Sequence, residues 1–300
     1  MHSVQWVDRG LQLNVPPLGE GTSSIGISRM SSVQLPGGIS TLWMQVRGST
    51  GIRAREGQFR LRRGDWMVLE RDSHPALQAD RAGICVGLCL SREPLAALDT
   101  CEVPLLPGRG QMSRTDMQIA MRLWRQIGQH AEDDPNACGD LRPLLLHMAD
   151  LQRGIAAQLQ HCPGRSLARK RHVLARLQRA RLFLEGHTDR VVRIGELANL
   201  ASLSYWYFSK AFQAVYGESP QACGARLRLE RAARLLRDSD MIIGEVAAAS
   251  GFENAGSFAR AFRAHFGACA TDYRDSACDR TANSAHIPRA SREAHPHAVP

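Results

Sequence analysis

One residue pattern occurs twice in the C-terminal part of the chain. The segment IGELANLASLSYWYFSKAFQAVYGESP begins at Ile194, and IGEVAAASGFENAGSFARAFRAHFGACA begins at Ile243. The first halves match at an offset of 49 residues, and the second halves match at an offset of 50, as Phe208 and Phe258 do. Because an internal repeat indicates a repeated structural unit, this region is expected to hold two similar units.

Each copy predicts two helices joined by a tight turn. In the second copy, Phe258, Phe262 and Phe266 recur every four residues and therefore share one face of a helix, while arginines occupy the opposite face. Gly251 stands at the turn, where the absence of a Cβ atom removes a steric penalty. The repeat therefore predicts two helix-turn-helix units.

The two units are joined by a segment that reads as one long helix. Pro220 suits the first turn of this helix, and the pattern runs to Arg237. Eighteen residues at the helical rise span about 27 Å. A connector of this length is expected to hold two recognition helices about 34 Å apart, so that both enter adjacent major grooves of one DNA duplex.

Positive charge is concentrated in the same region. Between Arg165 and Asp275 there are 18 Lys and Arg residues against 11 Asp and Glu residues, whereas residues 1–164 carry 17 against 16. Most of the formal net charge of +9 therefore lies in about a hundred residues. This distribution is typical of a module that binds a polyanion.

The remaining segments predict an α+β protein. Short β-prone runs separated by turn residues fill 35–90, and helical periodicity follows over 113–131 and 140–160. The stretch HCPGRS at 161–166 contains adjacent proline and glycine residues, which interrupt helices, and indicates a boundary before the helical C-terminal region. Residues 276–300 show no periodicity and are expected to form a disordered tail.

Membrane insertion and export are not expected. The longest apolar run, at 83–90, is far shorter than a membrane span, and the N-terminus lacks a cationic region followed by an apolar stretch. We therefore expect a cytoplasmic protein. None of the eight cysteines forms a Cys-x-x-Cys pair, so most are expected to be small buried side chains. Cys85 and Cys89 leave a metal or redox pair as an alternative.

An enzyme is the principal alternative class for the N-terminal half. A cupin-type oxygenase would hold its metal with two or three histidines and a carboxylate. Between residues 3 and 129 the only histidine is His74. A DNA-repair enzyme with a zinc–cysteine domain would need clustered cysteines, which the sequence lacks. We therefore expect no catalytic residues, no metal and no cofactor.

The helical region resembles the AraC/XylS family of transcription regulators over about 170–275. The resemblance is carried by G-x-S-P at Gly217–Pro220, by R-L-x-x-A-x-x-L-L from Arg228, and by the spaced phenylalanines that end in Tyr273-Arg274. Two positions depart from the family pattern. Cys223-Gly224 replaces an aromatic–aliphatic pair, and Ala270 replaces a proline of the second copy. Both departures affect packing or capping rather than the expected DNA-facing side.

The resemblance implies the domain order and the partners. It implies four segments: 1–160 for effector sensing or dimerisation, 161–169 as a linker, 170–275 as the double helix-turn-helix domain, and 276–300 as the tail. The implied function is a sequence-specific regulator, an activator in the main expectation, that binds double-stranded DNA, RNA polymerase and a small-molecule effector and forms a homodimer. An effector-independent regulator or a nucleoid-type DNA binder is the alternative.

A second, weaker resemblance concerns the effector. The layout RRGDWMVL followed by RAGICVGLCLSREPLAAL is similar to the siderophore-responsive branch of the family, which includes regulators of pyochelin and alcaligin systems. This likeness implies a siderophore effector and control of iron-uptake genes.

Eight residues are expected to contact DNA. They lie on the outer faces of the second helices and at their starts: Tyr205, Trp206, Ser209, Lys210 and Gln213 in the first copy, and Asn254, Arg260 and Arg263 in the second. Large aromatic residues on a solvated face are unusual, so Trp206 is expected to pack on sugar or on a thymine methyl group. Alternatively, Trp206 packs against the N-terminal domain.

The two recognition helices differ in the side chains they offer. Lys210 reaches guanine acceptors or phosphate, Arg260 suits bidentate recognition of guanine, and Arg263 suits phosphate. Because the second helix carries fewer long side chains, the second half-site is expected to be read less stringently.

Two further segments each have two alternative roles. The basic residues Arg169, Lys170, Arg171, Arg176 and Arg179 form either a solvated helix face or a phosphate-contacting track. The helix at 113–131, with Trp124 and its methionines, serves either the core or a dimer interface, and we favour the dimer interface.

Overall fold

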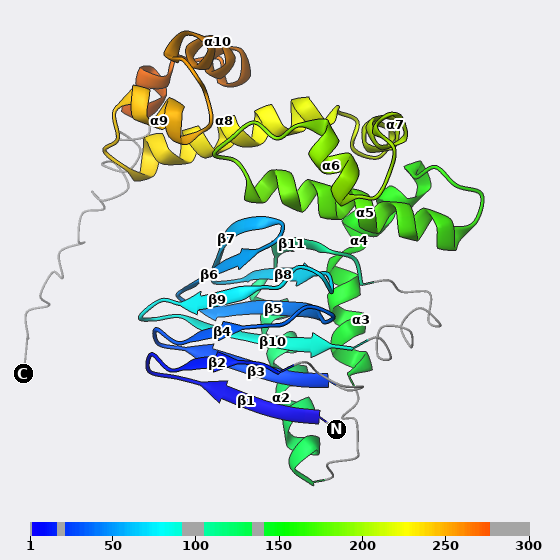
Figure 1. Cartoon of the computed structure of the whole chain (residues 1–300). Helices are drawn as coiled ribbons and strands as arrows, with labels where there is room; N and C mark the ends of the chain where they lie inside the picture. The colour runs from blue at the N-terminus through cyan, green and yellow to red at the C-terminus, as the bar shows by residue number, and fades with distance from the viewer. Residues whose placement is uncertain (1, 17–21, 92–104, 134–140, 277–300) are drawn as a thin grey trace, which may run out of the picture. The chain divides into compact units, whose positions relative to one another are not determined.

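The computed structural model describes residues 2–16, 22–91, 105–133 and 141–276 (Figure 1). The chain divides into two compact units. Met1–His187 and Val192–Gly224 form the first unit, and Thr188–Val191 and Ala225–Pro300 form the second. The first helix-turn-helix therefore groups with the β-rich part of the chain, although both helix-turn-helix units belong to one predicted domain.

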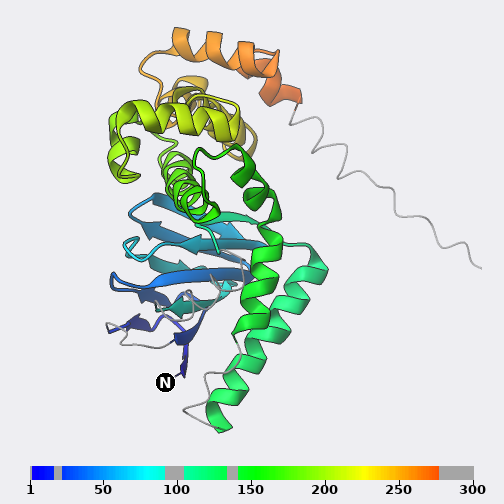
Figure 2. The same cartoon turned by 90° about the vertical axis from the view of Figure 1, so that its right-hand side faces the viewer.

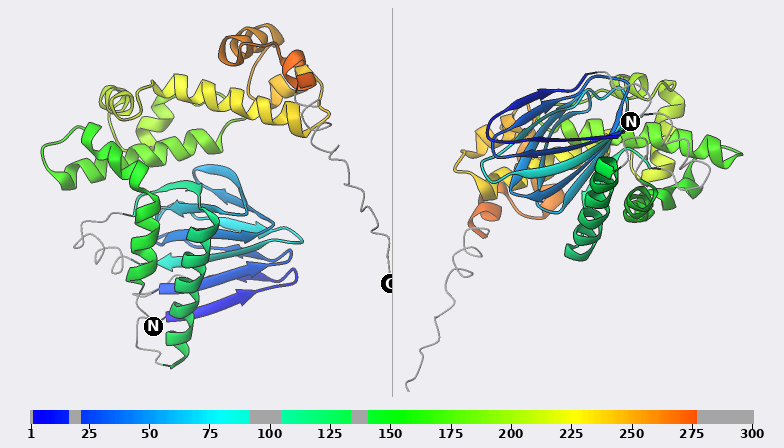
Figure 3. Two further views of the ribbon diagram at one scale, coloured as in Figure 1. Left: turned by 180° about the vertical axis from the view of Figure 1, so that it is seen from behind. Right: turned by 90° about the horizontal axis from the view of Figure 1, so that it is seen from below.

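Two sheets form the N-terminal part of the first unit (Figures 1 and 3). The six-stranded sheet has the order β1 (His2–Val7), β3 (Thr22–Ser28), β10 (Ile84–Leu90), β5 (Ser40–Arg47), β8 (Asp65–Leu69) and β11 (Gly108–Gln111). The five-stranded sheet has the order β2 (Gln12–Asn14), β4 (Ser32–Gln34), β9 (Ala76–Ala79), β6 (Ser49–Ala54) and β7 (Gly57–Arg62). The pairs β1–β3 and β2–β4 are parallel, and the other pairings are antiparallel.

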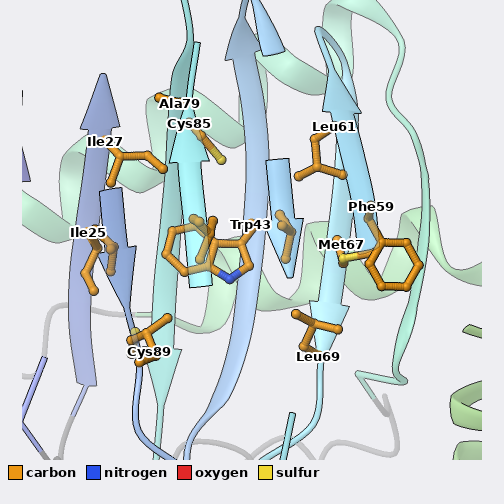
Figure 4. Close-up of a cluster of buried hydrophobic side chains, with 14 of the residues drawn as sticks. Ile25, Ile27, Trp43, Phe59, Leu61, Met67, Leu69, Ala79, Cys85 and Cys89 are labelled. Atoms are coloured by element: carbon orange, nitrogen blue, oxygen red, sulfur yellow. The ribbon is translucent and has the colours of Figure 1, made fainter. Parts of the chain in front are cut away.

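The two sheets differ in how many of their faces are buried. In β5, Trp43 joins the cluster between the two sheets (Figure 4). Its neighbours Leu42 and Met44 join a second cluster beneath the helices. The six-stranded sheet is thus covered on both faces, so its strands read as continuous apolar runs. In β7, buried and exposed residues alternate strictly, because the five-stranded sheet has one face in solvent.

Helices α2 (Arg114–Asp133) and α3 (Arg142–Leu151) cover the six-stranded sheet (Figure 2). Trp124 of α2 is buried against this sheet, and its indole N–H donates to the carbonyl oxygen of Gly87 at 3.2 Å. Short helices α4 (Arg153–Ala156) and η1 (Ala157–His161) follow α3. The inner face of α2 therefore belongs to the core, while a dimer interface on its outer face remains a prediction.

Seven helical segments make up the C-terminal region. They are α5 (Leu167–Gly186), α6 (Ile194–Leu200), α7 (Tyr205–Tyr216), α8 (Pro220–Asp238), α9 (Ile243–Ala249), α10 (Ala255–Phe266) and residues 270–276. The predicted α+β class and the two predicted helix-turn-helix units are confirmed.

The sequence did not predict every strand near the N-terminus. The structure adds four strands before residue 35, because their short, serine-rich runs gave little apolar periodicity. The single helix expected at 140–160 is broken into three pieces. Residues 162–166 lie between η1 and α5, and His161 is the last residue of η1. The domain boundary expected at 161–166 stays a prediction. The predicted disordered tail lies outside the described residues, except for Ser276.

The second unit has its own apolar core. Phe258 and Phe262 are fully buried in it, and Phe266 is half-buried beside Tyr273, with ring centroids 5.2 Å apart. Ala270, which stands at the start of the last helical segment, is also buried in this cluster. The seam of phenylalanines predicted from the sequence is therefore the centre of this unit.

Replacing Phe262 with alanine should destabilise the second unit without unfolding the first. Truncation of a fully buried phenylalanine removes apolar contacts and leaves a cavity, at a cost of about 3–5 kcal/mol. Hydrogen exchange of amides in α9 and α10 measures this loss in the full chain. Arg260→Ala, on the exposed face of the same helix, is the matched control and should leave exchange nearly unchanged. Equal effects of the two substitutions would refute the assignment of the faces.

Candidate nucleic-acid interface

Both helix-turn-helix units begin with the same backbone–side-chain contact. The carboxylate of Glu196 accepts a hydrogen bond from the backbone N–H of Arg193 at 3.0 Å. In the second unit, Glu245 accepts from the backbone N–H of Ile242 at 3.1 Å. These contacts satisfy a free donor at the start of each short helix. The repeated Ile-Gly-Glu sequence therefore has a capping function in both copies.

The turn of each unit uses a left-handed residue. Ser202 has φ of 49° and Gly251 has φ of 71°. A Cβ atom at position 251 would lie 2.7 Å from the Cα atom of Arg190, so this turn also requires glycine for space. The predicted role of Gly251 is confirmed by both its conformation and its surroundings.

Arginines from the preceding helices bind the carbonyl oxygens of these turns. Arg176 of α5 donates to the carbonyl oxygen of Ser202 at 3.1 Å, and Arg228 of α8 donates to that of Gly251 at 2.8 Å. Arg231 also reaches the carbonyl oxygen of Ala249 at 3.0 Å. Burial lowers the pKa of Arg228, which also lies over the ring of Phe252. Each recognition helix is thus positioned from behind by a charge-assisted hydrogen bond.

The outer face of α7 carries exposed aromatic and polar side chains. Tyr205 and Trp206 are 55% and 70% exposed, and Lys210 and Gln213 are exposed beside them. Its inner side chains, Phe208 among them, are buried. The exposure of Trp206 rules out the alternative that it packs against the N-terminal domain within the first unit. The Nζ atom of Lys210 lies 5.0 Å from the centroid of the Trp206 ring, so the two side chains form one exposed cation–π pair.

Ser209 does not share this exposure. It is half-buried, and its hydroxyl oxygen is enclosed without a hydrogen-bond partner. The expectation that it faces outward with its neighbours is therefore wrong for this hydroxyl, because position 209 lies at the edge between the inner and outer faces of α7. Contact between Ser209 and DNA remains a prediction that requires a different side-chain rotamer.

The outer face of α10 is sparser. Asn254 caps the helix by accepting a hydrogen bond from the backbone N–H of Ser257 at 2.8 Å, so its side chain already has a structural role. Arg260 and Arg263 are exposed, and small residues separate them from the start of the helix. The structure therefore brings two long cationic side chains to this face.

The C-terminal region matches a known family of domains. Residues 197–276 match the model of a helix-turn-helix domain of the AraC type. This domain is of the AraC/XylS type. The predicted resemblance is thereby confirmed for the region that holds both repeats.

Several transcription regulators are similar to this chain. The regulator ExsA of Pseudomonas aeruginosa is 27% identical over 174 residues, which cover 58% of this chain and 59% of ExsA. The activator RhaS of Pectobacterium carotovorum is 27% identical over 220 residues, covering 70% of this chain and 76% of RhaS. The chain thus spans less than two thirds of the length of ExsA.

A similar DNA-binding domain has been solved with DNA. The DNA-binding domain of AdpA, in complex with a target DNA, is 27% identical and aligns with a TM-score of 0.34 over 35% of this chain and 94% of the AdpA chain.

The basic residues of α5 ahead of the AraC/XylS-type repeats do not form one surface. Arg179 is buried, and its guanidinium group donates to Glu56 at 2.9 Å and to Asp72 at 2.8 Å. Arg176 is engaged with the turn at Ser202. For Arg179, both expected readings, a solvated face and a phosphate track, are therefore wrong. Its carboxylate partners lie more than a hundred positions away, so no local pattern signals them.

Three carboxylates surround the buried guanidinium group. Glu70 lies 3.9 Å from Arg179, and burial, together with the nearby charges of Asp72 and Glu56, raises the pKa of Glu70 above its ordinary value. Glu56 also accepts a hydrogen bond from the hydroxyl of Ser73 at 2.9 Å. Arg55 pairs with Asp72 at 3.0 Å, so a second arginine contributes to the charge balance of the cluster. The pKa of Glu70 is nevertheless raised, because its burial outweighs its attraction to Arg179.

The thiols of Cys85 and Cys89, on strand β10, are unreactive. Cys85 and Cys89 belong to the core between the sheets (Figure 4), and burial raises the pKa of each thiol to about 12. Such thiols stay protonated at neutral pH and do not bind metal or exchange disulfides readily. Within the described ranges, no three His, Cys, Asp or Glu residues are grouped so as to hold a metal ion. The described helices are also too short or too polar to cross a membrane.

Replacing Glu70 with glutamine should stabilise the first unit at neutral pH but not in acid. A carboxyl whose folded-state pKa is raised contributes most stability below its unfolded pKa and loses it as the pH rises through the raised value. Melting is followed by tryptophan fluorescence at pH 4 and pH 7.5, because Trp6, Trp43, Trp66, Trp124 and Trp206 all lie in the first unit.

Asp80→Asn is the control of opposite sign. The hydroxyl of Ser49 lowers the pKa of Asp80, so this carboxylate stabilises the folded state above its unfolded pKa, and the substitution should lower the melting temperature at pH 7.5 more than at pH 4. Stabilisation by Glu70→Gln that is equal at both pH values would contradict the proposed penalty.

Proposed function

We propose that this protein is a sequence-specific transcription regulator that binds duplex DNA through α7 and α10. The observation that carries the proposal is the exposed outer face of α7, where Trp206 and Lys210 form a cation–π pair on a helix of an AraC/XylS-type domain. An exposed tryptophan costs solvation in the free protein. Packing of its ring on sugar or on a thymine methyl group recovers that cost in the complex.

The two helices have different roles in this proposal. Tyr205, Lys210 and Gln213 supply contacts to base edges and phosphates from α7. Arg260 of α10 recognises guanine in the major groove, and Arg263 of α10 contacts phosphate. Because the side chain of Asn254 already caps α10, it positions the helix while its remaining amide group faces the duplex. Because α10 has fewer long side chains than α7, we expect it to discriminate less strictly between base sequences in the half-site that it contacts.

The N-terminal part is proposed to sense a small molecule. An open cavity of about 760 Å³ supports this role, since its lining includes Val68 and Glu70 of the β-rich part and Ala168 and His172 of α5. The hydroxyl oxygen of Thr41, which also lines the cavity, is buried without a hydrogen-bond partner. A ligand here would contact the helix that supports α6 and α7.

The finer proposal is that the effector is a siderophore and that the regulator activates iron-uptake genes together with RNA polymerase, as a homodimer in the cytoplasm. It rests on the weaker resemblance alone. An effector-independent regulator or a nucleoid-type binder is the alternative, and the enclosed hydroxyl of Thr41 favours a ligand-binding regulator over it.

Arg260→Ala and Arg263→Ala should separate recognition from electrostatic attraction. Binding of the full chain to its operator should weaken steeply with salt, because each phosphate contact releases counterions. Loss of a bidentate arginine should cost about 1–3 kcal/mol and relax the preference at one base pair, whereas loss of a phosphate contact should weaken binding to all sequences and lower the salt slope by about one contact.

Fluorescence anisotropy on operator and scrambled duplexes between 50 and 200 mM salt measures both effects. Arg53→Ala, on the exposed face of the five-stranded sheet, is the matched control and should change neither quantity. Affinity that is independent of salt, or unchanged in both α10 variants, would exclude the proposed interface.

Effector binding should depend on the cavity beneath α5. Calorimetric titration of the full chain with ferric and iron-free siderophores should give saturable binding that Ala168→Trp abolishes, because the bulky side chain fills the opening. Gly154→Ala, at an exposed position with open space around it, should bind as the wild type does. Absence of binding by every siderophore would remove the siderophore proposal and leave the DNA interface untouched.

A further inference from the structure

A second open cavity lies along α2 in the first unit. It measures about 1070 Å³ and runs between α2 and the strand ends at Val46 and Gly64. Helix α2 extends along the covered face of the six-stranded sheet (Figure 3), and the cavity is a groove beside this helix, next to the strand ends. We refer to it as the α2 groove. It shares no lining residue with the cavity beneath α5.

The floor of the α2 groove is apolar and rich in methionine. Val46, Met112, Met117 and Met121 line it, and the last two pack against the core beneath without being fully buried. Methionine side chains are flexible and polarisable, so a methionine-lined surface adapts to the side chains of a bound partner. The apolar floor is therefore suited to an apolar stripe rather than to a purely polar ligand.

The rim of the α2 groove has one sign of charge. Arg63 lies at the strand side, and Arg114, Arg122 and Arg125 lie on α2, all four exposed. Within the described part of the chain, no carboxylate lies within ion-pairing distance of these four guanidinium groups. The nearby Asp116 is engaged at the start of α2, where it accepts a hydrogen bond from the hydroxyl of Ser113 at 2.6 Å.

The size and shape of the α2 groove fit a helix. From Arg114 to Arg125 the axis of α2 advances about 17 Å, which equals about three turns of a second helix laid beside it. The volume of about 1070 Å³ lies at the upper limit of the range for small-molecule pockets, about 300–1,000 Å³. A methionine floor flanked by cations matches an amphipathic helix whose apolar stripe is bordered by Asp and Glu.

We propose that the α2 groove docks an acidic amphipathic helix of a partner protein. A second copy of this chain is disfavoured in this groove, because a two-fold interface would place the arginines of one rim against those of the other. A homodimer would therefore use a surface other than the α2 groove. Nucleic acid is disfavoured because its charged sugar-phosphate backbone has no apolar stripe that would pack on the apolar floor. The proposal does not depend on DNA binding, since every residue that carries it lies outside the helix-turn-helix units.

Selection of helical peptides from a displayed random library on the full-length protein tests the proposal. Enriched peptides should carry apolar residues at i, i+3, i+4 and i+7, flanked by Asp and Glu. A synthetic peptide of the enriched sequence should bind with an affinity that falls as salt rises. Its affinity should drop at least tenfold on Arg122→Glu/Arg125→Glu and also on Met121→Lys.

The control is Arg53→Glu/Arg81→Glu, a charge reversal of equal size at exposed positions away from α2, which should leave peptide binding unchanged. Tryptophan fluorescence and operator affinity verify that each variant is folded. Enrichment without acidic residues, or equal affinity for both charge-reversed variants, would overturn the proposal.

Two other occupants give distinct results. If the wild type is a dimer that Arg122→Glu/Arg125→Glu dissociates in sedimentation, the α2 groove is an interface between copies of this chain and the proposal is wrong. If a duplex without operator sequence displaces the peptide, the rim is a nucleic-acid site and the proposal is wrong in favour of that alternative.

Discussion

The buried contact between Arg179 and the carboxylates of Glu56 and Asp72 ties the first helix-turn-helix to the β-rich part of the chain. Arg179 lies on α5, and Leu182 of the same helix belongs to the apolar core between the two sheets. One turn earlier, Arg176 of α5 holds the turn between α6 and α7. A single helix therefore contacts both the β-rich part and the first helix-turn-helix.

The electrostatics of this contact are demanding. A buried ion pair recovers its desolvation cost only when hydrogen bonds satisfy both partners, and here one guanidinium group faces three carboxylates. Backbone packing reinforces the contact, since a Cβ atom at Gly186 of α5 would lie 2.2 Å from the carbonyl oxygen of Glu56. The close approach and the ion pair fix the position of α5 on the strands together.

The two helix-turn-helix units share their internal construction and differ on their exposed faces. Both use a glutamate at the start of the first helix, a left-handed residue at the turn and an arginine from the preceding helix. Outside this common frame, α7 displays Trp206 and Lys210, whereas α10 displays two arginines among small residues. Core packing constrains the repeated positions, and only the solvent-facing positions are free to diverge.

The sequence by itself determined the repeated helix-turn-helix units, their apolar faces, the connecting helix from Pro220 and the α+β class, because each depends on local periodicity and turn chemistry. Tertiary structure decided what lies against each face. It buried the hydroxyl of Ser209, placed Asn254 at a helix cap, and turned Arg179 from an apparent surface residue into a buried ion pair. These outcomes depend on contacts between residues far apart in the chain, and helical or strand periodicity carries no information about such partners.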